Sequence, residues 1–313
     1  MRIFVTGATG VIGRRVVPQL VRAGHDVTAI VRSADGASAL GRAGARPLDV
    51  DLFNPSALDR VMPGHDAVIN LATHMPSSTL RMLIPRSWRE NDRIRRDGSA
   101  CLVDAALRAG IVRFLQESFA PAYPDCGSRW ITEDTPLAPA RYNMSLLDAE
   151  RSAQRLASNG GADVVLRFAA FYGPDATQTR DTARLVRKGW APLPGAPDAY
   201  VSSVSHADAA SATVAALPVP AGAYNVVDDE PLTRREYFDA LAQALNVAPP
   251  RLPPAWLKHV FGSTGELLAR SQRMSNDKLR QVTGWTPRHR SAREGWRELA
   301  AALEDAAVSR PVD

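Results

Sequence analysis

The chain has 313 residues, of which 45% are hydrophobic and 23% are charged; this balance is typical of a globular enzyme and excludes an intrinsically disordered protein. A chain of this length can bury a large core without disulfides or metals, and its two cysteines, Cys101 and Cys126, predict reduced thiols and no zinc site. The net charge of +5 is spread along the sequence, and we find no nucleic-acid-binding motif, secretory signal or apolar run of bilayer length. We therefore expect a cytoplasmic protein that binds neither nucleic acid nor membrane.

The first half of the sequence alternates between short apolar runs and helical segments. The apolar runs predict strands at 2–6, 27–31, 46–50, 67–71, 112–116 and 164–168, and the intervening patterns predict helices at 13–23, 100–109 and 146–156. Because the strands are apolar on both faces, the alternation predicts a sheet covered by helices on both sides. The expected fold class is α/β, with a doubly wound parallel sheet.

The pattern changes after Tyr172-Gly173-Pro174, where Pro and Gly interrupt the chain more often. Beyond that point we expect strands at 200–204 and 223–227, helices at 206–217 and 233–245, and a mainly helical remainder. Thr233, followed three residues later by Glu236, predicts a capping box at the start of the 233–245 helix. We therefore divide the chain into a sheet domain of residues 1–175, completed by about 204–228, and a smaller cap formed by 176–203 and 229–313.

A glycine-rich turn follows the first strand in the run Thr6-Gly7-Ala8-Thr9-Gly10-Val11-Ile12-Gly13. In such a turn the first glycine permits the tight bend, the second lets the backbone approach a pyrophosphate, and the third lets the helix pack against the strand. The helix start then offers free N–H groups and a positive dipole end to phosphates. The pattern predicts a dinucleotide site, whose residues we expect to be Gly7, Thr9, Gly10, Val11, Ile12, Gly13 and Arg14.

The end of the second strand indicates which dinucleotide binds. NAD-binding chains place an acid there for the ribose hydroxyls, whereas this sequence has Arg32. An arginine attracts a 2′-phosphate through charge-assisted hydrogen bonds, and Arg14 is placed to reach the same group. We therefore expect NADP(H) as the cofactor. The ends of the next two strands should contact its adenine and nicotinamide sides through Asp51, Leu52, Leu71 and Ala72.

These features resemble the extended short-chain dehydrogenase/reductase family, also called the NAD-dependent epimerase/dehydratase family. The resemblance covers most of the chain and rests on the glycine-rich run, Arg32, and the segments 51–52, 70–72, 166–174, 204–208 and 224–226. It implies a Rossmann domain with a smaller C-terminal domain that closes over a small-molecule substrate. It also implies a homodimer.

The resemblance further implies a Tyr, a Lys four residues later and a Ser or Thr as the catalytic group, and it places Tyr142 at the Tyr position, in contact with the cofactor. Leu146 stands at the Lys position and Phe119 at the Ser/Thr position. Without a neighbouring ammonium, Tyr142 should keep a pKa near its reference of about 10, and it should donate a proton in a reduction. The remaining catalytic candidates are Ser118 and Glu117.

The family also has an Asn three residues before a Gly-Thr pair, and Arg95 stands at that spacing before Gly98-Ser99. An aromatic set near the cleft favours an apolar or ring-containing substrate, although each aromatic residue is alternatively a core residue. The residues we expect to line the substrate cleft are His74, Asn91, Phe119, Tyr123, Phe171, Tyr172 and Trp190.

The leading expectation is an NADPH-dependent oxidoreductase that reduces a carbonyl of a small apolar or polyketide-like substrate, with Tyr142 as the proton donor. Two alternatives stay open because Leu146 and Phe119 replace catalytic residues. One is an epimerase or dehydratase that retains its cofactor. The other is a catalytically silent NADP-binding sensor or scaffold.

Overall fold

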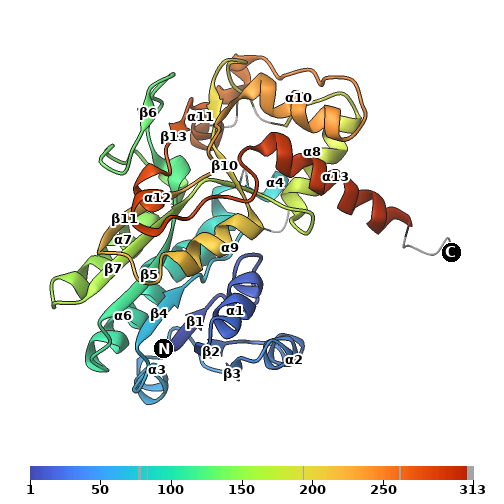
Figure 1. Ribbon diagram of the computed structural model, residues 1–313. Helices are drawn as coiled ribbons and strands as arrows, with labels where there is room; N and C mark the ends of the chain where they lie inside the picture. Colours follow the sequence, from blue (N-terminus) through green and yellow to red (C-terminus); the bar gives the residue numbers. More distant parts are fainter. Residues whose placement is uncertain (77–78, 83, 193, 261, 309–313) are drawn as a thin grey trace.

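The computed structural model describes residues 1–76, 79–82, 84–192, 194–260 and 262–308. A seven-stranded sheet runs through its larger domain in the order β11-β7-β5-β4-β1-β2-β3 (Figure 1). All neighbouring strands in it are parallel, which confirms the doubly wound sheet. The strands are β1 (Arg2–Thr6), β2 (Asp26–Ile30), β3 (Arg46–Leu48), β4 (Ala67–Asn70), β5 (Arg113–Phe119), β7 (Ala162–Phe168) and β11 (Gly222–Val226).

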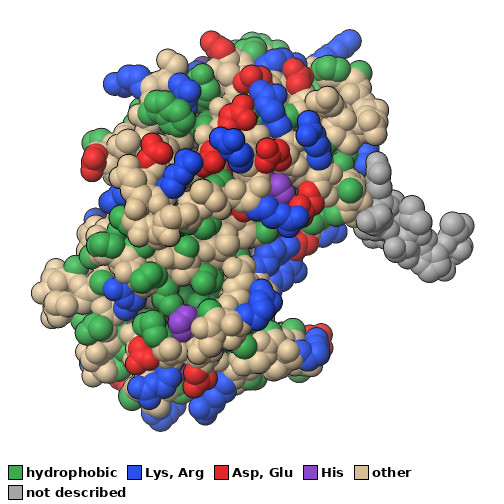
Figure 2. All heavy atoms as spheres, viewed as in Figure 1, with side chains coloured by type: hydrophobic (Ala, Val, Ile, Leu, Met, Phe, Trp, Pro, Cys, Tyr) green, Lys and Arg blue, Asp and Glu red, His purple; other side chains and the backbone are tan. Residues whose placement is uncertain are grey.

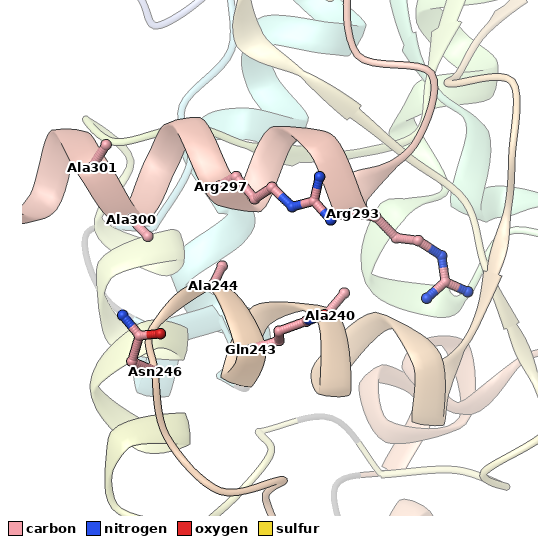
Figure 3. Close-up of a pocket in the computed structure, with 8 residues that line it drawn as sticks. All are labelled: Ala240, Gln243, Ala244, Asn246, Arg293, Arg297, Ala300 and Ala301. Atoms are coloured by element: carbon pink, nitrogen blue, oxygen red, sulfur yellow. The ribbon is translucent and has the colours of Figure 1, made fainter.

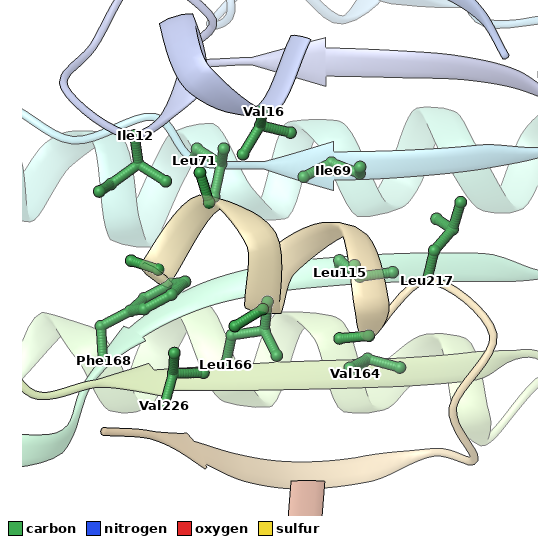
Figure 4. Close-up of a cluster of buried hydrophobic side chains, with 14 of the residues drawn as sticks. Ile12, Val16, Ile69, Leu71, Leu115, Val164, Leu166, Phe168, Leu217 and Val226 are labelled. Atoms are coloured by element: carbon green, nitrogen blue, oxygen red, sulfur yellow. The ribbon is translucent and has the colours of Figure 1, made fainter. Parts of the chain in front are cut away.

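Successive residues of the strands enter two hydrophobic clusters on opposite faces of the sheet. In β1, Ile3 and Val5 join one cluster and Phe4 joins the other. The first cluster, part of which Figure 4 shows, is covered by α1 (Gly13–Arg22), α2 (Ala34–Arg42) and α9 (His206–Ala215). The second is covered by α3 (Pro55–Val61), α6 (Ser99–Arg108) and α7 (Ser145–Ala157). Burial of both faces explains the unbroken apolar runs in the sequence.

Between β4 and α6 the chain forms α4 (Thr79–Met82), the 3₁₀ helix η1 (Pro85–Trp88), α5 (Arg89–Arg93) and the π-helical turn η2 (Ile94–Gly98). After β5 come the short helices η3 (Ala120–Ala122) and η4 (Arg141–Asn143), the second of which leads into α7. These irregular segments follow the carboxyl ends of β4 and β5, where parallel α/β sheets bind their ligands.

The cap has its own hydrophobic cluster, in which Phe238, Leu241 and Trp296 are buried. The cluster joins α8 (Thr177–Arg187), α10 (Arg234–Ala244) and α13 (Ala292–Val308) (Figure 1). The 3₁₀ helix η5 (Ala255–His259) packs against α11 (Gly262–Ala269). The predicted capping box of Thr233 and Glu236 is confirmed. However, α12 (Asp277–Thr283) packs through Leu279 against the sheet domain, so residues 229–313 are not all part of the cap.

Three pairs of short strands complete the elements: β8 (Ala170–Tyr172) with β10 (Ser203–Ser205), β9 (Tyr200–Val201) with β12 (Leu232–Thr233), and β6 (Trp130–Ile131) with β13 (Arg273–Met274). None of the helices in the described part of the chain is long and apolar enough to cross a membrane. On the face shown in Figure 2, basic and acidic side chains are interspersed.

Candidate functional site

Three glycines shape the loop between β1 and α1. Gly7 has a φ of +68°, and a Cβ there would lie 2.2 Å from the carbonyl oxygen of Leu71. A Cβ at Gly13 would lie 2.2 Å from the carbonyl oxygen of Gly7, so the close approach of α1 requires glycine. At Gly10 a Cβ would meet only that same oxygen, at 3.2 Å. The outer side of the loop at Gly10 is therefore open.

The amides at the start of α1 are available to an anion. Gly10 is exposed, and neither Val11 nor Ile12 donates its N–H to a backbone carbonyl of the residues that the structure describes. These N–H groups, with the positive end of the helix dipole, form the kind of cradle that binds phosphate. The loop therefore fits the pyrophosphate of a dinucleotide.

The two arginines expected at the 2′-phosphate differ in their surroundings. Arg32, after β2, is exposed and forms no ion pair with any described residue. Arg14 instead forms an ion pair with Asp175, whose carboxylate also accepts a hydrogen bond of 2.7 Å from Arg15. Arg32 is thus available to a phosphate as the chain stands, whereas Arg14 would have to leave Asp175.

Sequence reasoning missed Asp175. Besides the two arginines, it lies 3.0 Å from Nδ1 of His206 at the start of α9. It directly follows Tyr172-Gly173-Pro174, but no local pattern shows that its partners lie about 160 residues earlier on α1 and 31 residues later on α9.

The strand ends beyond the loop are held by a buried polar network around Asn70. Its Oδ1 accepts hydrogen bonds from Thr6 and from the amide of Ala72, and its Nδ2 donates to Ser99 and Gln116. The network fixes the chain at Leu71 and Ala72 against the carboxyl ends of β1 and β5. Asp51 is exposed and accepts from the amide of Phe53, while Leu52 packs beneath Gly98.

Tyr142 lies in η4, in a small hydrophobic cluster with Trp88 and Leu267. Its ring centroid is 5.0 Å from that of Trp88, the side chain is 9% exposed, and its hydroxyl makes no hydrogen bond within the described residues. Burial raises the pKa of Tyr142 to about 12, although Arg95 and Arg270 oppose the shift. The expected value near 10 was therefore too low, because the sequence did not show how deeply the phenol is buried.

Arg95 and Glu117 form a buried ion pair close to Tyr142. Nη2 of Arg95, in the π-helical turn η2, donates to Oε1 of Glu117 at 2.6 Å. Nε of Arg95 and Oε2 of Glu117 are buried without a partner, as are both polar side-chain atoms of Asn143, the residue after Tyr142. Polar groups of this kind are nearly always satisfied in folded proteins, so these atoms are candidates to contact a ligand or water.

Ser118 is not brought to Tyr142. Its hydroxyl donates to Glu150 of α7 at 2.5 Å, and the same carboxylate pairs with Arg167. Arg167 donates in turn to the hydroxyl of Tyr123, which is fully buried. Ser118 therefore belongs to a structural network, and of the two interpretations of Tyr123 the structure supports the packed aromatic.

Of the other residues expected at the substrate cleft, some lie near Tyr142 or at the surface and others are buried in structural contacts. Phe119 packs against the cluster that contains Tyr142. Asn91 is buried, and its Oδ1 accepts from the amide of the exposed His74, so it holds the loop after β4. Phe171 and Trp190 are 37% and 50% exposed. Tyr172 is not at an open surface, because its ring is buried 4.8 Å from that of Trp296.

Within the described residues, no three His, Cys, Asp or Glu side chains are grouped as metal ligands. A groove of about 320 Å³ between α10 and α13 contains none of the residues predicted from the sequence (Figure 3). The polar groups that could take part in a reaction are thus those at the carboxyl edge of the sheet.

Comparison with known proteins agrees with this geometry. Residues 7–220 match a family model described as NAD(P)H-binding. The chain is 35% identical over 305 residues to a 3-diazoavenalumate denitrifying reductase of a Streptomyces species, covering 94% of this chain and 99% of that protein. It is 26% identical over 258 residues to a Stigmatella aurantiaca ketoreductase named for a farnesylated dihydroquinoline oxide, covering 79% of this chain and 74% of that one. A human epimerase family protein crystallised with NADPH has the same fold, with a TM-score of 0.78 at 19% identity over 96% of this chain and 99% of that one.

The fold, the phosphate loop and these matches define the class as that of the NAD(P)-dependent oxidoreductases with a Rossmann domain. Within that class, the chain belongs to the NAD(P)H-binding, extended short-chain dehydrogenase/reductase family.

Proposed function

We propose that this protein is an NADPH-dependent reductase that transfers hydride to a carbonyl carbon of a small, largely apolar molecule, with Tyr142 as the proton donor. The observation that carries the proposal is the state of Tyr142. Its phenol is held neutral by burial, and its hydroxyl has no protein partner among the described residues. A neutral phenol can give a proton to a developing alkoxide, which is what a reduction requires.

The preference for NADPH is supported by Arg32. It is exposed at the end of β2, where no acid is present to bond with the ribose hydroxyls, and no carboxylate of a described residue pairs with it. The phosphate loop at Gly10 to Gly13 would hold the pyrophosphate, and Arg32 the 2′-phosphate. When bound, the dinucleotide supplies the hydride.

Arg95 supports the proposal as a substitute for the absent lysine. Leu146 at the lysine position is completely buried, so no ammonium reaches the phenol from there. The charge of Arg95 instead favours the ionised form of Tyr142, and its ion pair with Glu117 holds the guanidinium in place. After Tyr142 gives up its proton, the arginine would stabilise the phenolate. Arg95 is thus a positioning residue, and it occupies the place of the family's asparagine.

The test is NADPH consumption by the purified protein on a panel of aldehydes, ketones and quinones. Consumption with a matching amount of alcohol product is the expected result. Product formed without net consumption would instead indicate an epimerase or dehydratase with a retained cofactor. NADPH binding without turnover on the whole panel would favour a sensor or scaffold.

A second candidate reaction is reductive loss of dinitrogen from an aryl diazonium group, because the relative matched along almost its full length is named as a denitrifying reductase. In that reaction a C–H bond replaces the C–N bond, and N₂ leaves with no proton supplied by the protein. The phenol of Tyr142 would then be dispensable. Loss of carbonyl reduction but not of diazonium reduction in Tyr142→Phe would separate the two reactions.

We also propose a cytoplasmic location, as expected from the reduced cysteines, and a homodimer, as the family resemblance implies. Sedimentation of the protein at micromolar concentration tests the second, since a monomer there would overturn it.

A further inference from the structure

Arg234 is a buried cation with no anion beside it. It is the first residue of α10, and its side chain is 0% exposed. Nη2 donates to the carbonyl oxygen of Leu268 at 2.9 Å, but Nε and Nη1 are buried without a hydrogen-bond partner. Within the part of the chain that the structure describes, no carboxylate forms an ion pair with this guanidinium.

A buried charge of this kind requires an explanation. Burial lowers the pKa of Arg234 to about 10, with no charged neighbour contributing, so the side chain stays cationic at neutral pH. A buried guanidinium without a partner strongly destabilises a folded protein, whereas an apolar residue of similar size would not. A missing anion that arrives with a ligand would account for the arginine, since its donors suit carboxylate and phosphate groups.

A cavity of about 400 Å³ lies on the other side of Gly195 from the guanidinium, which does not itself line the cavity. Gly195 lines the cavity, and a Cβ at this residue would be 2.8 Å from Nε of Arg234, so only glycine fits between them. Ala199, which accepts the backbone N–H of Arg234, and Ala269 line it too. The volume falls in the usual range for small-ligand sites. Gly195 has a φ of +135°, and rotation of this one residue would open the guanidinium to the cavity.

The rim of the cavity contains charges of both signs. Lys258 is half-buried and makes no ion pair with a described residue, and the exposed residues Asp125 and Asp198 also line the space. Both acids are exposed to solvent, whereas Arg234 is buried behind Gly195. An anion is therefore favoured at the inner end of the cavity.

The position of α11 connects this cavity with Tyr142. Leu268 accepts from Arg234 through its carbonyl oxygen, and its side chain packs against the cluster that contains Tyr142. Arg270, two residues later, is close enough for its charge to favour the ionised form of Tyr142. The guanidinium and the phenol thus both lie near the end of one short helix, α11.

We propose that Arg234 binds an anionic group, a carboxylate or a phosphate, at the end of the substrate remote from the carbon that is reduced. The inference rests on the proposed function, because it places the reacting end at Tyr142. It narrows the substrate class from a small apolar molecule to an aromatic or apolar molecule with one anionic end.

The experiment measures anion binding without turnover. Benzoate, phenyl phosphate and neutral benzamide are titrated by calorimetry into the NADPH-saturated protein and into Arg234→Met. We expect at least one of the two anions to bind the wild type more tightly than benzamide does, and we expect Arg234→Met to weaken it by about ten- to a hundredfold. The two anions distinguish a carboxylate site from a phosphate site.

Arg235→Met is the matched control. Arg235 is the next residue, but its guanidinium already pairs with Asp239 and donates to the carbonyl oxygen of Pro250. Anion affinity should be unchanged in this variant. If Arg234→Met does not fold, Arg234→Lys gives the same comparison, because a lysine keeps the charge but not the guanidinium geometry, and intermediate affinity is expected.

Anions that bind the Arg234 variants as tightly as the wild type, or that do not bind the wild type at all, would show that Arg234 is structural only. The result is separable from the proposed function. Failure of Tyr142 as the proton donor would leave anion binding intact, and failure of the anion site would leave reduction of neutral carbonyls intact.

Discussion

Gly10 is the residue of the phosphate loop where a side chain would harm the ligand more than the fold. Gly7 and Gly13 have backbone atoms within 3 Å of any added Cβ, whereas Gly10 meets only one oxygen at 3.2 Å. We expect Gly10→Val to keep its circular dichroism spectrum and lose dinucleotide binding, because the side chain would project where the pyrophosphate approaches.

Gly41→Val is the control for that substitution. Gly41 is an exposed residue of α2 with no atom within 4 Å of an added Cβ. Normal NADPH binding by Gly10→Val would mean that the phosphates lie elsewhere.

Arg32 sets the choice between the two dinucleotides. An arginine–phosphate contact contributes about 1.5–3 kcal/mol, which corresponds to a preference for NADPH of about ten- to a hundredfold. Arg32→Asp should reduce NADPH affinity and leave NADH affinity much less affected. Fluorescence titration with both cofactors provides the measurement. Equal affinities in the wild type would refute the assignment.

The hydroxyl of Tyr142 should be needed for turnover but not for folding or NADPH binding. Tyr142→Phe removes one atom and almost no volume, and carbonyl reduction should fall by about 10² to 10⁴. Because the folded-state pKa is about 12, the phenol stays protonated through the neutral and mildly alkaline range. The Tyr142-dependent rate should therefore show no loss on the alkaline side up to about pH 10.

Arg95→Met provides a further check in the same pH–rate profile. Removing the opposing cation should raise the pKa of Tyr142 further and lower kcat. Arg95→Lys keeps a cation and should therefore retain part of the wild-type kcat. Full activity in Tyr142→Phe would mean that Glu117 or water supplies the proton.

At the level of elements, Asp175 connects two helices, α1 and α9. It follows β8, and its carboxylate contacts Arg14 and Arg15 of α1 and His206 of α9. Burial, followed by the charges of Arg15 and Arg14, lowers the pKa of His206 to about 3. The imidazole is therefore neutral in the folded protein throughout the physiological range.

This neutral histidine gives the fold a pH dependence. Below its unfolded pKa of 6.5 the unfolded chain takes up a proton at His206, whereas the folded chain does not until about pH 3. The unfolded state then binds more protons, so stability falls as the pH falls through that range. The free energy of unfolding, measured with urea at a series of pH values, should change with pH more steeply in the wild type than in His206→Asn. The difference between the two slopes should be up to about 1.4 kcal/mol per pH unit. Parallel slopes would contradict the neutral assignment.

The elements of the sheet could be predicted because their signals are local. The apolar runs, the glycine at each turn and the capping box at Thr233 each depend on a few neighbouring residues. Other features depend on segments that are distant in the sequence, and no spacing predicts them. They are the contacts of Asp175, the ion pair of Arg95 with Glu117, and the burial of Arg234. For the same reason Ser118, although adjacent to the catalytic position, could not be assigned to the network of Glu150.

At the level of the whole molecule, the two domains are interleaved along the chain. The cap cluster draws on α8, which precedes β11, and on α10 and α13, which follow it. β11, which comes after the first part of the cap, pairs with β7 at the edge of the sheet. A fragment of residues 1–175 would contain the phosphate loop, Arg32 and Tyr142 but lack β11, α9 and α12.

We expect that fragment to be insoluble or aggregated and to bind no NADPH. Without α9 and β11, the apolar residues Val164, Leu166 and Phe168 of β7 lose much of their cover, and β7 becomes an open edge. Size-exclusion chromatography and NADPH titration of the fragment are the measurements. A monodisperse fragment with wild-type affinity would show that the sheet domain is independent of the later segments.

The place of β11 at the outer edge of the sheet also matters during translation. β7 ends at Phe168 and β11 begins at Gly222, so residues 169–221, which include the first part of the cap, must be synthesised before β11 leaves the ribosome. Throughout that interval the nascent chain presents the unpaired edge of β7, a surface of the kind that chaperones cover and that neighbouring polysomal chains can join. The yield of active protein in a cell should therefore depend on elongation rate and chaperone supply more than the stability of the finished molecule would suggest.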